Sequence, residues 1–197
     1  MHERFASAEL NPSLTWFCEP PSWRVEPGGL VVEPAANTDF WQRTHYGFRA
    51  DNGHFLCLPA QGDFELTTRV SFTPRHQYDQ AGLMLRVSPD CWLKASVEHE
   101  PDEAHDRLGA VVTNHGYSDW STQPLPHSVR SLWFRILAQP TAVIVQTSLD
   151  GQAWEQIRLA HLAERSPSQP LQCGLYACSP KDAGFRAQFH LLDFQPR

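Results

Sequence analysis

The segment Trp92–Glu98 places side chains that can bind a polar molecule on one face of a predicted strand. A strand alternates its side chains between two faces, so one face carries Trp92, Lys94, Ser96 and Glu98 and the other carries Leu93, Ala95 and Val97. A ring, an amine, a hydroxyl and a carboxylate in one row are typical of a surface that holds a polar ligand. The alternative is an exposed strand face with one covered tryptophan.

Earlier in the chain, the segment Asn37–Phe48 adds aromatic and charged side chains, including Trp41, Arg43 and Tyr46. Tryptophan and tyrosine rings stack on the apolar faces of sugars, while arginine and aspartate hold hydroxyl groups in fixed directions. Trp41 and Arg43 share one strand parity, which predicts that they stand side by side on a concave sheet. Core packing of Trp41 and a rim salt bridge of Arg43 are the alternatives.

Two further pairs complete the predicted site. Asp79 and Gln80 begin a strand, where they either tie down a loop or contact the ligand. Asp119 and Trp120 follow the turn signal at 114–117, which predicts a loop opening onto the same face. The predicted ligand-binding residues are Trp41, Arg43, Tyr46, Asp79, Gln80, Trp92, Lys94, Glu98, Asp119 and Trp120.

The elements that position these residues are predicted to be strands. Alternating patterns occur at 29–32, 64–72, 82–87, 92–98, 110–114, 131–138, 142–147 and 185–194, with turn residues between them. Asp150-Gly151 predicts a tight hairpin. The best helix candidate is 154–165, of which only a fragment is expected to be helical. With no linker or repeat, residues 1–197 are predicted to form one domain, a two-sheet sandwich.

Composition excludes several classes of protein. The 197 residues carry a net charge of −6 with scattered basic residues, which argues against a nucleic-acid partner. We expect no membrane association, because no apolar run reaches membrane length and the N-terminus lacks a signal-peptide layout. Five cysteines without paired spacing favour buried, reduced thiols and a cytoplasmic location. Histidines 99, 105 and 115 lack a metal-ligand spacing, so neither metal nor cofactor is predicted.

Several blocks together resemble the DUF1349 family, which includes the bacterial YesU-type proteins and the yeast regulation-of-enolase protein. They are Asn37–Phe48, Asp79–Leu83, Trp92–Lys94, Ser118–Ser121 and Gly174–Pro180. The resemblance implies an all-β fold, a concanavalin A-like jelly-roll sandwich of two antiparallel sheets with a concave face. A similar Asp-Gln-Ala-Gly-Leu and Trp-Leu-Lys pair occurs in the C-terminal sandwich domain of some family 43 xylosidases, which points toward glycans by analogy.

Glu98 is the single candidate for a catalytic acid or base. The glucanases of this fold place two carboxylates on one strand in a Glu-x-Asp-x-Glu run. Here Pro101 follows Glu98 closely and would end the strand, so the pair is absent in that form. The sequence therefore favours a binding protein over an enzyme.

Three functions remain open at this point. The first is binding of a carbohydrate or related polyhydroxylated small molecule on the concave face, in sugar metabolism. The second is a sugar hydrolase or isomerase that uses Glu98. The third is a protein-interaction module that regulates a metabolic enzyme. A monomer and a homodimer fit all three.

Overall fold

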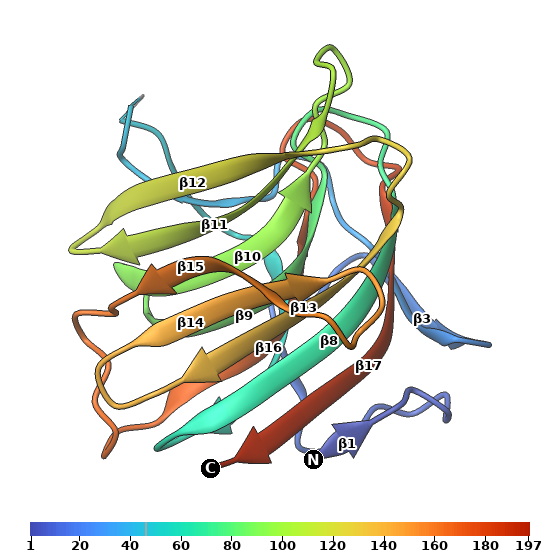
Figure 1. Cartoon of the computed structure of the whole chain (residues 1–197). Coiled ribbons are helices and arrows are strands. Elements are labelled where there is room, and N and C mark those ends of the chain that lie inside the picture. The colour runs from blue at the N-terminus through green and yellow to red at the C-terminus, as the bar shows by residue number, and fades with distance from the viewer. Residues whose placement is uncertain (46) are drawn as a thin grey trace.

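The computed structural model describes residues 1–45 and 47–197, and within these residues every regular element is a β-strand. Two large sheets stack on each other, and both termini lie at the same end of the molecule (Figure 1). Within the sheets all strand pairs are antiparallel, as expected of the predicted jelly-roll sandwich. The part of the chain that the structure describes contains no helix able to span a membrane.

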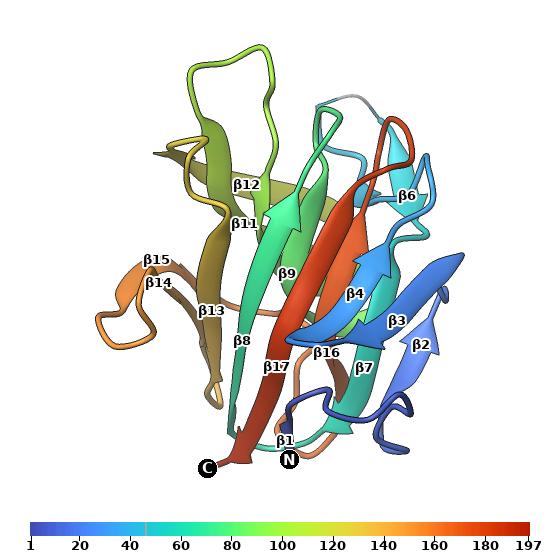
Figure 2. The ribbon, with the colours of Figure 1, turned by 90° about the vertical axis from the view of Figure 1, so that its right-hand side faces the viewer.

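The larger sheet has the order β15-β14-β13-β8-β17-β4-β3, with β1 added beside β17. Its strands are β1 (His2–Glu3), β3 (Ser22–Glu26), β4 (Gly29–Glu33), β8 (Phe64–Thr73), β13 (Ser131–Ala138), β14 (Val143–Ser148), β15 (Glu155–Ala160) and β17 (Arg186–Pro196). The second sheet has the order β12-β11-β10-β9-β16-β7-β2. Its strands are β2 (Thr15–Phe17), β7 (His54–Ala60), β9 (Gln80–Ser88), β10 (Cys91–Glu98), β11 (Asp106–Asn114), β12 (Tyr117–Leu125) and β16 (Leu171–Cys178). A short hairpin of β5 (Phe40–Gln42) and β6 (Arg49–Asp51) forms a third, two-stranded sheet, of which β6 is labelled in Figure 2.

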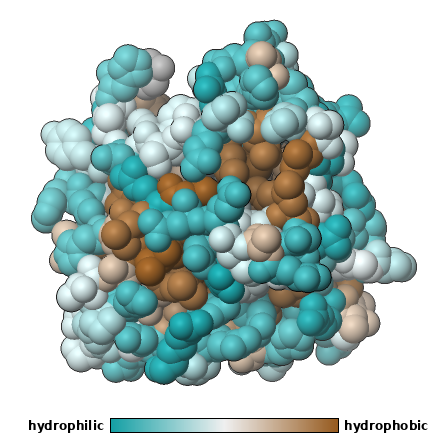
Figure 3. Space-filling model, in the orientation of Figure 1, coloured by the Kyte–Doolittle hydropathy of each residue, from teal (hydrophilic) through white to brown (hydrophobic). Residues whose placement is uncertain are grey.

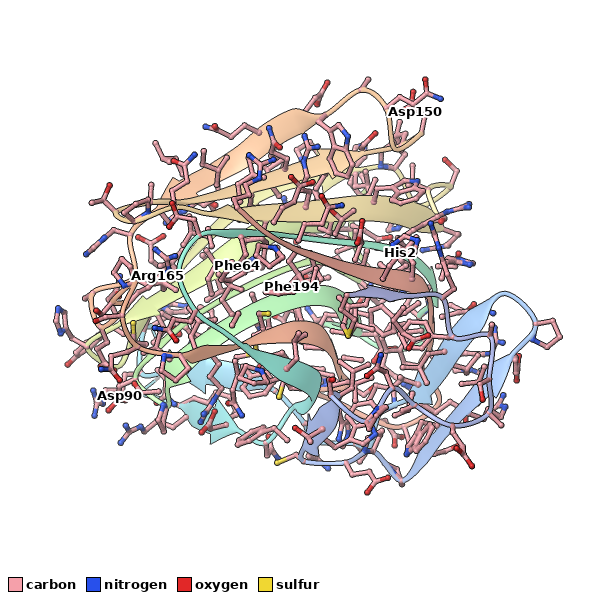
Figure 4. All side chains as sticks on the ribbon, turned by 90° about the horizontal axis from the view of Figure 1, so that it is seen from below. His2, Phe64, Asp90, Asp150, Arg165 and Phe194 are labelled. Carbon is pink, nitrogen blue, oxygen red and sulfur yellow. The ribbon has the colours of Figure 1, made fainter. Side chains whose placement is uncertain are left out.

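The main core lies between the two large sheets and follows the alternation of the strands. In β13 every second side chain is buried, and β8 shows the same period. The rings of Phe64 and Phe194, both labelled in Figure 4, pack together with their centroids 5.4 Å apart. All eight segments predicted from alternation overlap strands of the structure.

The helix predicted at 154–165 is wrong. The chain turns at Asp150-Gly151, at the tip labelled in Figure 4, and Gly151 takes a φ of +77° there. The Asp150 carboxylate accepts hydrogen bonds from the backbone N–H groups of Gln152 and Ala153. The returning segment then pairs with β14 as edge strand β15, so hairpin pairing overrides the local pattern.

Residues 118–120 were predicted in a loop and instead belong to β12. The turn predicted just before them is present, with Gly116 at a φ of +71°, but the chain pairs with β11 immediately after it. Asp119 lies opposite Val112 and Trp120 opposite Val111 in this ladder. Trp120 therefore projects from an edge strand.

Gly82, in the Asp79–Leu83 block, lies too close to the neighbouring strand for any side chain. A Cβ added at Gly82 would lie 1.9 Å from the carbonyl oxygen of Ala95 on the neighbouring strand. No side chain fits such an approach, so this position of β9 requires glycine.

The five cysteines are all free, as predicted, and all but Cys18 are buried. Burial raises the pKa of the Cys57, Cys91, Cys173 and Cys178 thiols above their ordinary value. These thiols pack as small apolar groups.

A cluster around Asp106 joins the loop after β10 to the loop after β12. The buried Asp106 carboxylate contacts His99 Nδ1 at 2.7 Å, His127 Nδ1 at 3.0 Å and the Arg130 guanidinium at 3.2 Å. It also accepts a hydrogen bond from the backbone N–H of Glu100. Burial alone would raise the pKa of Asp106, but these hydrogen bonds and the nearby histidines hold it below its ordinary value. The imidazoles thus serve as hydrogen-bonding partners of a buried carboxylate.

Asp106→Asn is expected to lower the free energy of unfolding at pH 7 by about 2–3 kcal/mol, because Arg130 loses its opposite charge and an amide NH2 group replaces one of the two acceptor oxygens. Since the folded carboxyl has a lowered pKa, its contribution is present above about pH 4 and is lost as the pH falls further. Urea denaturation at pH 7 and pH 3 measures both effects. Asp102→Asn, exposed in the same loop, is the control, and equal stability of both variants at pH 7 would contradict the assignment.

Candidate ligand-binding site

Strand β10 distributes its side chains as the alternation predicts. Leu93, Ala95 and Val97 join the core between the sheets. On the outer face, Trp92 joins a second apolar cluster, in which Phe40 from the β5–β6 hairpin packs 6.1 Å from the Trp92 ring and 6.3 Å from the Tyr176 ring. The hairpin thus covers one part of this outer face.

Beside the hairpin the outer face is hollowed into a cavity of about 1070 Å³. It lies between β5, the two loops that precede β6 and β9, the loop after β16, and strands β9, β10 and β12. Aromatic, charged and amide side chains line it together. They include Asn37, Asp39, Trp41, Thr44, His45, Phe48, Tyr78, Gln80, Lys94, Glu98, Ser118, Asp119, Trp120, Pro180 and Lys181.

Lys94 is the centre of the cavity floor. Its side chain is 2% exposed, and its Nζ lies 3.0 Å from Asp39 Oδ1 and 2.7 Å from Gln80 Oε1. Burial alone would lower the pKa of Lys94, but the carboxylates of Asp39 and Glu98 outweigh it and raise the pKa above its ordinary value. Lys94 is therefore a fixed ammonium ion and not a nucleophilic amine.

Gln80 is held in one orientation by four contacts. Its Oε1 accepts hydrogen bonds from Lys94 and, at 3.1 Å, from the Tyr176 hydroxyl. Its Nε2 donates to the Tyr78 carbonyl at 3.1 Å and more weakly to Asp39 Oδ1 at 3.5 Å. The amide is thus fully used within the protein, as a buried glutamine requires.

Glu98 lies directly opposite Gln80 in the β9–β10 ladder. Because the Lys94 ammonium donates to Gln80, the Lys94 side chain extends along β10 toward Glu98. The Glu98 residue is 8% exposed and lines the cavity, yet its carboxyl makes no hydrogen bond with the described residues. Burial raises the pKa of Glu98 to about 7, helped by Asp39 and Glu100 and opposed by Lys94. A carboxyl in this state can accept or donate a proton near neutral pH.

Six predicted site residues meet in this cavity: Trp41, Gln80, Lys94, Glu98, Asp119 and Trp120. They come from three separate parts of the chain. Trp41, however, stands on the covering hairpin and not on the large sheet. Its indole Nε1 donates to the Thr44 carbonyl at 3.0 Å, which fixes the ring in the cavity wall.

Three other predicted residues serve the structure around the cavity and do not line it. Trp92 is on the predicted face, but it is fully buried beneath Phe40. The Asp79 carboxylate accepts hydrogen bonds from the backbone N–H groups of Arg75 and His76 and ties down the loop before β9. Arg43 donates to the Gly116 carbonyl at 3.2 Å and lies over the Tyr117 ring, so it joins the hairpin to the β11–β12 turn. Tyr46 lies outside the described residues.

Residues missing from the predicted set include Asp39, Phe48, Tyr78 and Lys181. Asp39 shares the parity of Trp41, so the sequence did carry a signal for it. Phe48, Tyr78 and Lys181 lie in loops, and only the three-dimensional arrangement brings them to the rim. There the Lys181 ammonium lies 5.4 Å from the centroid of the Tyr78 ring.

Comparison with known proteins identifies the family. The family described as "Protein of unknown function (DUF1349)" matches residues 16–197. The chain belongs to the DUF1349 family. A relative from Saccharomyces cerevisiae, named "Regulation of enolase protein 1", is 36% identical to this DUF1349 chain over 175 residues, covering 89% of the chain and 85% of the relative.

Solved structures share the fold of this DUF1349 chain. A functionally unknown protein from Saccharomyces cerevisiae is 34% identical with a TM-score of 0.86, covering 94% of this chain and 97% of that one. The GH43B protein of a Bacteroides ovatus xyloglucan PUL gives a TM-score of 0.78 at 16% identity. This match covers all of the DUF1349 chain but 39% of the larger protein, and it supports the shared sandwich fold alone.

Proposed function

We propose that this protein binds a carbohydrate or a related polyhydroxylated small molecule in the cavity on the outer face of the seven-stranded sheet. The observation that carries the proposal is Glu98, a buried carboxyl that reaches the cavity without a hydrogen-bonding partner among the described residues. Burying such a group costs free energy unless a ligand or water supplies the missing partner. The rings of Trp41 and Trp120 in the walls suit the apolar faces of a sugar ring.

A second candidate is an enzyme that moves a proton on a sugar. It is favoured by the pKa of Glu98, which is about 7 and therefore near the value that suits a general acid or base. Glu98→Gln separates the two functions once a ligand is known. The variant abolishes turnover if Glu98 transfers a proton, whereas it only weakens affinity if Glu98 accepts a hydroxyl hydrogen bond.

A role in metabolic regulation is supported by the name of the yeast relative, which refers to regulation of enolase. In this proposal a protein partner binds this chain when its cavity holds the ligand. A concave, mainly apolar cavity with a few buried polar groups favours a small-molecule ligand, whereas protein docking favours a broad apolar surface. On the face drawn in Figure 3, hydrophobic areas are separated by hydrophilic residues.

The free thiols support placement in a reducing compartment such as the cytoplasm.

Trp120→Ala is expected to weaken binding of a neutral sugar about tenfold, because the ligand loses the apolar area of the indole ring. Trp120 is 38% exposed on the edge strand β12, so its removal leaves the core intact. Isothermal titration calorimetry with a sugar identified by a thermal-shift screen measures the change in affinity.

Trp154→Ala is the matched control, because Trp154 lies against Arg135 of the other sheet, with the guanidinium carbon 4.0 Å from the ring centroid. The control should bind the sugar with unchanged affinity. Equal loss in both variants, or unchanged affinity in Trp120→Ala, would count against the cavity as the binding site.

A further inference from the structure

The polar atoms that remain unused on the cavity floor are mainly acceptors. Asp39 Oδ1 accepts hydrogen bonds from Lys94, from Gln80 and from the backbone N–H of Phe40. Asp39 Oδ2 has no hydrogen-bonding partner among the described residues. Neither oxygen of the Glu98 carboxyl has a hydrogen-bonding partner among the described residues. Gln80 has no atom left, because its amide is used within the protein.

Among the described residues of this group, Lys94 supplies the one N–H donor that remains unused. An ammonium carries three N–H groups, and two of them are directed at Asp39 and Gln80. A molecule that reaches the floor therefore meets one N–H of Lys94 and the oxygens of two carboxyl groups, of which Glu98 also offers an O–H while it is protonated. Such a molecule must itself donate hydrogen bonds in order to satisfy the floor.

The charges on the cavity floor also favour an uncharged ligand over an anion. The positive charge of Lys94 is already matched by Asp39, so the floor has no surplus positive charge to attract an anion. Glu98 adds a negative charge next to this pair once it ionises, above about pH 7. A phosphate or carboxylate would be desolvated against two carboxyl groups without enough donors to replace its water, which disfavours its binding.

We propose that the part of the ligand that reaches the floor is an uncharged polyol, whose neighbouring hydroxyl groups donate to Asp39 Oδ2 and Glu98 and accept from Lys94. The inference rests on the proposed function and specifies its ligand class. Phosphorylated and carboxylated sugars are excluded from the floor.

Lysine offers a direct probe, because the chain contains just two lysines, Lys94 and Lys181, and both line the cavity. Selective ¹⁵N labelling of lysine side chains gives an NMR signal for the floor and one for the rim. Neutral sugars are titrated beside matched anions: glucose, galactose, mannose and xylose against glucose 6-phosphate, mannose 6-phosphate, glucuronate and galacturonate. We expect at least one neutral sugar to shift the Lys94 signal, with every anion binding at least tenfold more weakly.

The outcomes separate the two levels of the proposal. An anion that shifts Lys94 with affinity equal to its neutral partner would overturn the ligand class and leave the binding function standing. No shift of Lys94 with any of these sugars would overturn the proposed function itself.

Glu98→Gln tests the mechanism of exclusion. The amide removes a carboxyl group and adds N–H donors, so the preference for neutral over anionic sugar should fall at least threefold. Glu155→Gln, exposed on β15 of the other sheet, is the control and should keep the full preference. An unchanged preference in Glu98→Gln would show that the floor carboxyl does not select the ligand.

Discussion

Lys94→Met is expected to lower the free energy of unfolding by about 3–5 kcal/mol, the range for breaking a buried ion pair by removing one partner. Methionine has a similar length but no charge, so the change isolates the ammonium. Asp39 Oδ1 then keeps a charge without its cation, and Gln80 Oε1 loses its shortest hydrogen bond, at 2.7 Å. Urea denaturation monitored by tryptophan fluorescence measures the loss.

The matched control for this variant is Lys181→Met. Lys181 is exposed and contacts the Tyr78 ring at the rim, so its replacement should change stability by less than about 0.5 kcal/mol. If Lys94→Met were as stable as this control, the floor network would contribute nothing to folding. Lys94 would then belong to the ligand site alone.

The alternation of apolar and polar residues predicted most of the strands, because burial of one face of a sheet imposes a period of two on the sequence. In β10 it also assigned every side chain to its correct face. It did not show how much of the outer face the β5–β6 hairpin covers, and this covering separates buried Trp92 from accessible Glu98 on the same face. Such covering depends on contacts between segments that are distant in the chain.

The two errors of secondary structure have a related cause. Residues 154–165 and 118–120 each follow a turn, and each continues as an edge strand because a preformed partner strand lies beside it. Local preference is weak at an edge, where one side of the strand is open, so pairing decides. The hydrogen bonds of Asp79 and Arg43 likewise depend on loop geometry, which residue types alone do not determine.

Glu98→Gln is expected to raise the free energy of unfolding at pH 8 by about 3 kcal/mol and to leave it nearly unchanged at pH 4. In the folded protein Glu98 keeps its proton up to about pH 7, whereas in the unfolded chain it loses the proton near its ordinary pKa of 4.5. Because the folded state holds the proton more tightly, ionisation of Glu98 favours unfolding as the pH rises from 4.5 to 7. A shift of this size corresponds to about 3 kcal/mol, at about 1.4 kcal/mol per pH unit.

The measurement is the difference in stability between the variant and the unmodified protein at each pH, since this difference removes the contribution of all other groups. Chemical denaturation at half-unit intervals from pH 4 to pH 8.5 gives both curves. Glu155→Gln, exposed on the other sheet, should run parallel to the unmodified protein throughout. Parallel curves for Glu98→Gln as well would mean that its carboxyl titrates normally in the fold. A gain in stability upon its removal would instead mark Glu98 as a group kept for binding or chemistry at a cost to folding.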